Sequence, residues 1–180
     1  MKNQEFKIDT KSGVVVFCQK SHGRVFTSKS KADSIENFNI GIGQLIAMKR
    51  NEIKIRKVDI ESMQKVVSEC QTKAKENKGT TASKLYANFV QIAMDKVKMS
   101  YNHIRELKED LDRLYNGTYI VKPYAEILAD HKKVRNGTAE DKEDVFKHPY
   151  AVPQEIVDGT HIFDVVNGSA VIKPIHDFSE

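Results

Sequence analysis

Apolar side chains between residues 81 and 115 recur at alternating spacings of four and three. Such a repeat keeps one apolar stripe on the same side of an α-helix and is typical of helix–helix packing. Lys108 interrupts the stripe once. The stripe consists of Val90, Met94, Val97, Tyr101, Ile104, Leu111 and Tyr115, and a second register of Ala93, Val97, Ile104, Leu107, Leu111 and Leu114 widens it. The pattern predicts one uninterrupted helix over residues 81–115.

A helix of this length measures about 50 Å at 1.5 Å per residue. A compact domain of this chain's size has a radius of gyration of about 16 Å. We therefore expect the helix to extend beyond the domain or to pack against a second subunit. A second helical pattern covers residues 60–77, with Asp59 as its N-cap, and Thr80 or Thr81 caps the long helix. Two long helices joined by so few residues form an antiparallel αα-hairpin.

The N-terminal third of the chain has the pattern of a sheet followed by a helix. Residues 13–19 and 24–31 read as two strands joined by a turn at residues 20–23, and Phe6 and Ile8 can extend the sheet. A helix is predicted next, with apolar residues at helical spacing from Phe38 to Met48. Its candidate N-caps are Asp33, Ser34 and Asn37.

Two features of this first helix leave alternatives open. Gly41 and Gly43 weaken a helix, so they indicate either close packing against the sheet, which we favour, or the approach of a ligand. Residues 51–57 alternate between apolar and charged side chains. That segment is either strand-like or a continuation of the helix through a charged patch.

The C-terminal third is predicted to be a small mixed module. A short β-like segment at 118–121 precedes a helix that begins at Pro123, where the fixed φ of proline suits the first helical turn. Residues 138–144 are predicted to be a linker or a short helix, and the prolines make residues 148–153 irregular. Residues 160–166 and 169–173 flank Asn167-Gly168, which is the preferred pair for a type I′ hairpin turn.

These elements predict an α+β fold with three consecutive segments. Residues 1–57 form a β-hairpin with a helix, residues 58–117 form the long helical hairpin, and residues 118–180 form a small C-terminal module ending in a β-hairpin. We expect a homo-oligomer through the long helix. The predicted interface residues are Val90, Met94, Val97, Tyr101, Ile104 and Leu111.

The formal charge of +4 is unevenly distributed along the chain. Residues 1–80 carry a net charge of +7, residues 81–136 carry +3, and residues 137–180 carry −6. The basic half suits an anionic partner, although a lysine-rich solvated surface explains it equally well. Cys18 and Cys70 lie far apart, as expected of two reduced thiols. With no long apolar run and no signal peptide, we expect a cytoplasmic protein that does not contact a membrane.

No motif in the sequence indicates catalysis. Gly41-Ile-Gly43 lacks the third glycine and the preceding buried strand of a dinucleotide site. The six histidines include no pair at a spacing of four, and neither cysteine has the context of a nucleophile. We therefore expect a protein that is not an enzyme, with no catalytic residue, no metal site and no cofactor.

The basic residues of the N-terminal half are the best candidates for a binding site. Some lie on or after the second predicted strand, and others follow the first predicted helix. If the hairpin packs on that helix, the two groups converge and suit a phosphate, either of a nucleotide or of a nucleic-acid backbone. The predicted ligand-binding residues are Arg24, Lys29, Lys31, Lys49 and Arg50.

Residues 13–50 carry a pattern of two strands, a polar turn, an acidic connector and a glycine-containing helix that ends in basic residues. The residues that carry it are Val14-Val-Val-Phe17, His22-Gly23, Val25-Phe-Thr27, Lys29, Asp33, Gly41, Ala47 and Lys49-Arg50. This segment resembles a pattern of small bacteriophage proteins. The layout of a strand core followed by long helices is similar to that of the phage sponges that sequester the cyclic ADP-ribose signals of Thoeris defence.

The resemblance implies a phage accessory protein that acts against a bacterial defence in the cytoplasm of the host. Its target is then an anionic nucleotide signal, or a nucleic-acid-handling effector such as a CRISPR complex. The alternative is a nucleic-acid-binding protein with a dimeric helical scaffold, which predicts affinity that falls steeply with salt. A purely structural protein predicts neither kind of binding.

Overall fold

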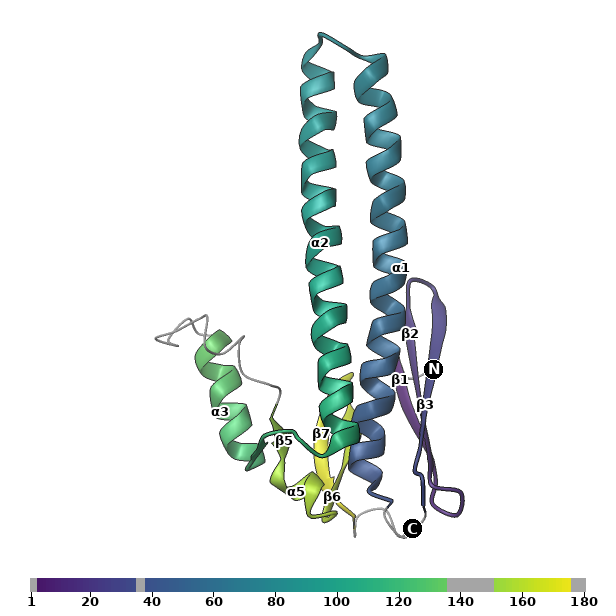
Figure 1. Cartoon of the computed structure of the whole chain (residues 1–180), viewed down its shortest axis with the longest axis vertical. Helices are drawn as coiled ribbons and strands as arrows, with labels where there is room; N and C mark the ends of the chain where they lie inside the picture. Colours follow the sequence, from purple (N-terminus) through teal and green to yellow (C-terminus); the bar gives the residue numbers. More distant parts are fainter. Residues whose placement is uncertain (1–2, 35–37, 136–150, 176–180) are drawn as a thin grey trace. The chain divides into compact units, whose positions relative to one another are not determined.

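The computed structural model describes residues 3–34, 38–135 and 151–175 of the chain, and its fold is α+β (Figure 1). The elements in chain order are β1 (Gln4–Asp9), β2 (Val14–Ser21), β3 (Arg24–Lys31), α1 (Ile40–Glu76), α2 (Thr81–Asn116), β4 (Val121–Lys122), α3 (Tyr124–Arg135), β5 (Val152–Pro153), α5 (Gln154–Val157), β6 (His161–Val166) and β7 (Ser169–Pro174).

The chain divides into two compact units that do not follow the three consecutive segments expected from the sequence. The sheet unit contains residues 1–51 and 109–180, and the hairpin unit contains residues 52–108. The N-terminal sheet and the C-terminal module therefore belong to the same unit. Both long helices contribute to each unit, because α1 and α2 each run through a unit boundary.

The N-terminal strands form an antiparallel sheet in the order β1-β2-β3. Phe6 of β1 lies opposite Phe17 of β2, with ring centroids 4.7 Å apart. His22 and Gly23 form the two-residue turn between β2 and β3, and both have positive φ, at 51° and 73°. That is the geometry of a type I′ turn, whose twist matches that of the flanking strands. The predicted hairpin is confirmed, and Phe6 belongs to the added strand.

Helix α1 begins later and runs further than the sequence indicated. Its N-cap is Asn39, whose Oδ1 accepts a hydrogen bond from the backbone N–H of Ile42 at 3.0 Å. The prediction of Asp33 or Ser34 as the cap was wrong, since the helix begins at Ile40, and Asn37 lies outside the described residues. An N-cap side chain reaches the free backbone N–H groups two or three residues further along the helix, as Asn39 reaches Ile42.

A single helix of 37 residues replaces the two helices predicted over residues 38–77. Of the two interpretations of residues 51–57, the continuing helix is correct, and Asp59 lies inside α1 and does not cap a new helix. No glycine or proline occurs between Gly43 and Gly79, which lies in the loop after α1. Nothing in the backbone chemistry therefore interrupts the helical hydrogen bonds.

The two glycines of α1 allow close packing, which for Gly43 is against the N-terminal sheet as predicted and for Gly41 is against α5. A Cβ atom on Gly41 would lie 2.5 Å from Cγ2 of Ile156 in α5, and one on Gly43 would lie 3.0 Å from Cγ2 of Val15 in β2. Distances this short leave no room for a side chain. The missing Cβ atoms let the start of α1 touch both the N-terminal sheet and the C-terminal module.

Two amide side chains, one buried and one half-buried, bond the same helix to the C-terminal module. Gln44 is fully buried, its Nε2 donates to the carbonyl oxygen of Phe163 at 2.6 Å, and its Oε1 accepts from the N–H of Phe163 at 2.7 Å. Asn39, besides capping α1, donates through Nδ2 to the carbonyl oxygen of Ile156 at 2.8 Å. These bonds satisfy backbone groups that would otherwise be buried without partners. An apolar cluster of Val15, Phe17 and Ala47, with Phe6, Phe38 and Met48 against it, completes this core.

The C-terminal module agrees with the sequence at its hairpin and differs before it. Strands β6 and β7 pair around Asn167-Gly168, both with positive φ, as predicted. The short strand predicted at 118–121 begins at Val121, and it pairs in parallel with β5. Val152–Pro153, expected to be irregular, forms β5, and α5 follows it. Helix α3 begins after Pro123 as predicted, whereas residues 138–144 lie outside the described residues.

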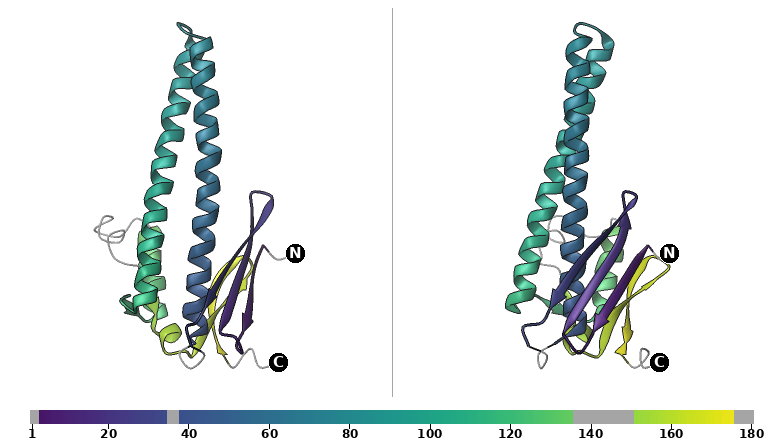
Figure 2. Two further views of the ribbon diagram at one scale, coloured as in Figure 1. Left: turned by 45° about the vertical axis from the view of Figure 1, so that its right-hand side comes forward. Right: turned by 90° about the vertical axis from the view of Figure 1, so that its right-hand side faces the viewer.

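The hairpin unit consists of the middle of α1 and most of α2. Both views of Figure 2 show these stretches side by side. Thr80 is the cap of α2, since its Oγ1 accepts a hydrogen bond from the N–H of Ser83 at 3.3 Å. The predicted long helix and αα-hairpin are confirmed.

Candidate functional site

The inner face of the hairpin unit is a narrow seam. Ile60 of α1 is buried against the second apolar register predicted for α2, in which Ala93, Ile104 and Leu107 are buried. Near the tip, Oγ of Ser83 donates to the carbonyl oxygen of Ala74 at 2.9 Å, so small residues lie where the helices meet. A seam this narrow covers only a strip of each helix.

Four large apolar side chains of α2 lie outside that seam, and we call Leu85, Phe89, Ile92 and Met99 the outer stripe. Leu85, Phe89 and Ile92 are each about half exposed, and Met99 is 70% exposed. Their spacings of four, three and seven residues place them on one side of the helix. The sequence pattern did not predict this stripe as an interface, because the widened inner seam already accounted for most of the apolar residues of α2.

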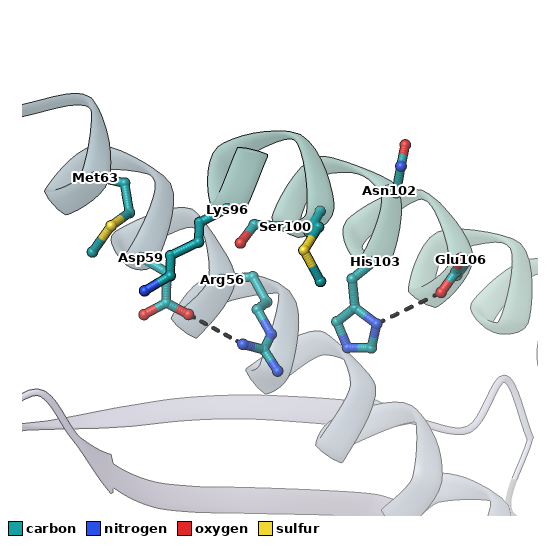
Figure 3. A pocket seen from close by; sticks show the side chains of 9 residues that line it. Arg56, Asp59, Met63, Lys96, Ser100, Asn102, His103 and Glu106 are labelled. Carbon is teal, nitrogen blue, oxygen red and sulfur yellow. Dashed lines mark hydrogen bonds and ion pairs between the residues drawn. The ribbon is translucent and has the colours of Figure 1, made fainter. Parts of the chain in front are cut away.

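A groove of about 660 Å³ lies beside the outer stripe, between α1 and α2 within the hairpin unit (Figure 3). Arg56, Asp59 and Met63 line it from α1, and Lys96, Met99 and His103 are among its α2 residues. The groove is open on one side rather than enclosed. It continues the outer stripe along α2, because Lys96 and His103 follow Ile92 at spacings of four and eleven.

The charged groups of the groove are mostly engaged with one another. Nε2 of His103 lies 2.7 Å from Oε1 of Glu52, which joins the two helices, and Nδ1 lies 3.7 Å from Oε2 of Glu106. Arg56 forms longer ion pairs, 3.4 Å to Asp59 and 3.5 Å to Glu52. Within the described part of the chain, Nε of Arg56 is buried with no hydrogen-bond partner. The groove thus combines the apolar side chains of Met63 and Met99 with paired charged groups.

The opposite face of the hairpin unit carries a second hollow of about 430 Å³. It is lined mainly by Val67, Met94, Val97 and Tyr101, which we call the opposite face. Met94 and Tyr101 are each about half exposed. Helix α2 thus presents apolar side chains on both sides of the strip that α1 covers.

Some residues of the predicted oligomer interface are buried within the chain, and others are exposed. Ile104 and Leu111 are buried within the chain, so a second subunit has no access to them. Val90 and Val97 are half-buried, whereas Met94 and Tyr101 remain available on the opposite face. The alternating spacing identified an apolar side of the helix correctly, but α1 occupies part of it.

The structure does not gather the five predicted ligand-binding cations into one site. Arg24 and Lys31 lie at opposite ends of β3, seven residues apart, which corresponds to about 23 Å. The guanidinium of Arg24 stacks over Phe26 at 5.5 Å. Lys49 is largely buried in an ion pair with Asp110, with 2.7 Å between Nζ and Oδ2.

Two of the five cations do come together. Nη1 of Arg50 donates to the carbonyl oxygen of Lys29 at 2.5 Å, and its guanidinium lies over the ring of Tyr115 at 5.6 Å. Lys29 and Lys31 are both exposed on the same side of β3. The bond of Arg50 is to the backbone carbonyl of Lys29, so the side chains of Lys29 and Lys31 are what the structure leaves of the predicted cluster.

The described residues contain no group of three His, Cys, Asp or Glu side chains arranged to hold a metal ion. None of the described helices has the length and apolar character needed to cross a membrane. Comparison of the chain with protein-family models, with curated proteins and with solved structures gives no significant match.

Proposed function

We propose that this chain is a non-enzymatic binding protein that acts by docking the hairpin unit onto another protein. The observation that carries the proposal is the surface of α2, where large apolar side chains flank the inner seam on both sides. Exposed apolar patches of this kind mark interaction sites in proteins. Covering each half-exposed side chain contributes roughly 1 kcal/mol to binding.

The resemblance of residues 13–50 to small bacteriophage proteins supplies the biological setting of the proposal. The partner is then a component of a bacterial defence system in the host cytoplasm, and the chain inhibits it by occupying a surface. Sequestration of a nucleotide signal has weaker support, because Arg24 lies far from Lys31 and Lys49 is already paired with Asp110. A phosphate-binding site needs several cations that converge on one position.

The opposite face is the better candidate for this partner. Its hollow is lined by apolar side chains from both helices together with Gln64, Lys98 and Asn102, and Tyr101 offers a large ring with a polar hydroxyl, which is typical of interface anchors.

The proposal can be tested by plaque formation on bacteria that carry one defined defence system, with and without expression of the chain. Thoeris and a CRISPR system are tested separately. We expect the wild-type chain to restore plaque formation against one of them. The double variant Met94→Lys/Tyr101→Lys is expected to lose this effect, because two ammonium groups would enter the apolar hollow.

The matched control is Lys29→Gln/Lys31→Gln, which removes two exposed cations of β3 and is expected to keep the effect. The reverse result, with the effect lost in the lysine variant and kept in the opposite-face variant, would favour an anionic ligand over a protein partner. No restoration by the wild-type chain against either system would contradict the counter-defence setting.

A further inference from the structure

We propose that the outer stripe and the adjacent groove form an interface for a second copy of this chain, so that two hairpin units pack as a four-helix bundle. This inference is independent of the partner proposed for the opposite face. It rests on the spacing of the stripe, on the width of the exposed apolar face and on its area.

The spacing of the outer stripe is that of a coiled-coil seam. With Phe89 assigned to position a of a heptad, Leu85, Ile92 and Met99 all fall on d, and Lys96 is the next a residue. Apolar residues at a and d pack into holes on a facing helix. The occupant of this face is therefore an α-helical surface with a similar repeat.

Lys96 has a specific consequence in this register. A single lysine at an a position fixes the number and alignment of the paired helices, at some cost in stability. Its methylene groups cover neighbouring apolar side chains while the ammonium group reaches the edge of the interface. Such a residue limits association to a defined oligomer instead of open-ended aggregation.

The width of the face indicates that the occupant has two helices. Besides the stripe on α2, Val66 of α1 is 38% exposed and Met63 of α1 lines the groove. One helix is about 10 Å in diameter, so a single helix in the groove would cover only about half of a face that is two helices wide. A second hairpin unit is two helices wide and carries the same face. In an isologous dimer the same patch of each copy contacts the other copy.

The area of the face is sufficient for a specific dimer. From Leu85 to Met99 the stripe is about 21 Å long, and the groove extends the face to Glu106 at about 32 Å, at 1.5 Å per residue. A width of about 20 Å gives roughly 400–600 Å² per copy. Two copies then bury about 1,000 Å², which is the lower limit for a specific interface. We therefore expect a dimer that dissociates in the micromolar range.

Sedimentation equilibrium of the full-length chain, from low to high micromolar concentrations, tests this inference. The average mass of the wild-type chain should rise from one chain towards two. The double variant Phe89→Lys/Ile92→Lys should weaken dimerisation by roughly 100-fold or more, because it places four like charges in the seam. Its helical circular dichroism and thermal midpoint as a monomer should match the wild type, since both side chains are already half exposed.

The control is Met94→Lys/Tyr101→Lys, which adds the same charges to the opposite face and should dimerise as the wild type does. Lys96→Leu should tighten association about tenfold and should produce species larger than a dimer. A wild-type chain that stays monomeric at the highest concentration would overturn the proposal and leave the face for another protein. Equal loss of dimer in the variants of both faces would overturn the assignment to the outer stripe.

Discussion

The sheet unit and the hairpin unit differ in how their large apolar side chains are arranged and covered. In the sheet unit, Phe17 and Ile156 are fully covered, and the buried amide of Gln44 has both of its groups paired. In the hairpin unit, Leu85, Ile92 and Met99 are half exposed or more. Exposed apolar side chains of the sheet unit, such as Val25 and Leu128, come from different elements, whereas those of the outer stripe follow one another along one side of α2, as in surfaces that other proteins cover.

The two units also differ in how their polar groups are held. The polar contacts of the sheet unit, such as those of Asn39 and Gln44, are short and involve buried backbone groups. The ion pairs of the hairpin unit lie on a partly exposed groove, where solvent screens them and their contribution to stability is small. Substitutions at the buried polar contacts of the sheet unit should therefore affect stability more than substitutions at the exposed ion pairs of the hairpin unit.

The largest expected effect concerns Gly41. Replacing it with leucine places a side chain where Ile156 already lies, so the start of α1 must move away from the C-terminal module. We expect Gly41→Leu to lower the free energy of unfolding by about 3 kcal/mol or more, measured by chemical denaturation. The control Ala87→Leu, at an exposed helical position of α2, should have almost no effect. A fully stable Gly41→Leu would contradict the close packing described for this helix.

A smaller effect is expected at Gln44. Gln44→Ala removes the amide that pairs with both backbone groups of Phe163 and leaves them buried without partners. We expect a loss of about 2–4 kcal/mol in the free energy of unfolding. Gln64→Ala on the exposed surface of α1 is the matched control and should stay within about 0.5 kcal/mol of the wild type. Similar losses in both variants would show that the two hydrogen bonds between Gln44 and Phe163 contribute little to stability.

The smallest effect on stability is expected in the outer stripe. Leu85→Ser should lower the free energy of unfolding of the monomer by about 1 kcal/mol, measured at a concentration too low for association. The reason is that this side chain is already about half exposed and lies outside the inner seam. A loss as large as that of Gln44→Ala would mean that the outer stripe serves the fold of the single chain.

Much of the fold follows from local patterns in the sequence. The pairs His22-Gly23 and Asn167-Gly168 both adopt the positive φ values of tight hairpin turns, and the apolar repeat of residues 81–115 forms one helix. Local patterns misplaced the start of α1, where Asn39 serves as the cap, and divided α1 into two helices. A cap is chosen by where the chain turns into the helix, and that turn depends on the bonds Asn39 makes to α5.

The candidate site was less accessible to the sequence. The apolar repeat correctly identified α2 as a helix that packs against neighbours. It did not separate Ile104 and Leu111, which are buried within the chain, from Met94 and Tyr101, which are exposed. The five basic residues were grouped by their position after predicted elements. Arg24 and Lys31 lie at opposite ends of one strand, and Lys49 is paired with Asp110. Residues that are close in the sequence pattern are therefore not gathered into one site.

The sequence by itself determined the type and length of most elements, because helix and strand periods and turn residues act over a few positions of the chain. Tertiary structure alone decided which side of α2 is covered, which cations are paired and where the amide of Gln44 is satisfied. Each of these outcomes joins residues separated by tens of positions. A repeat shows which side chains share a face, and only the packed chain shows which of those faces is still open to a partner.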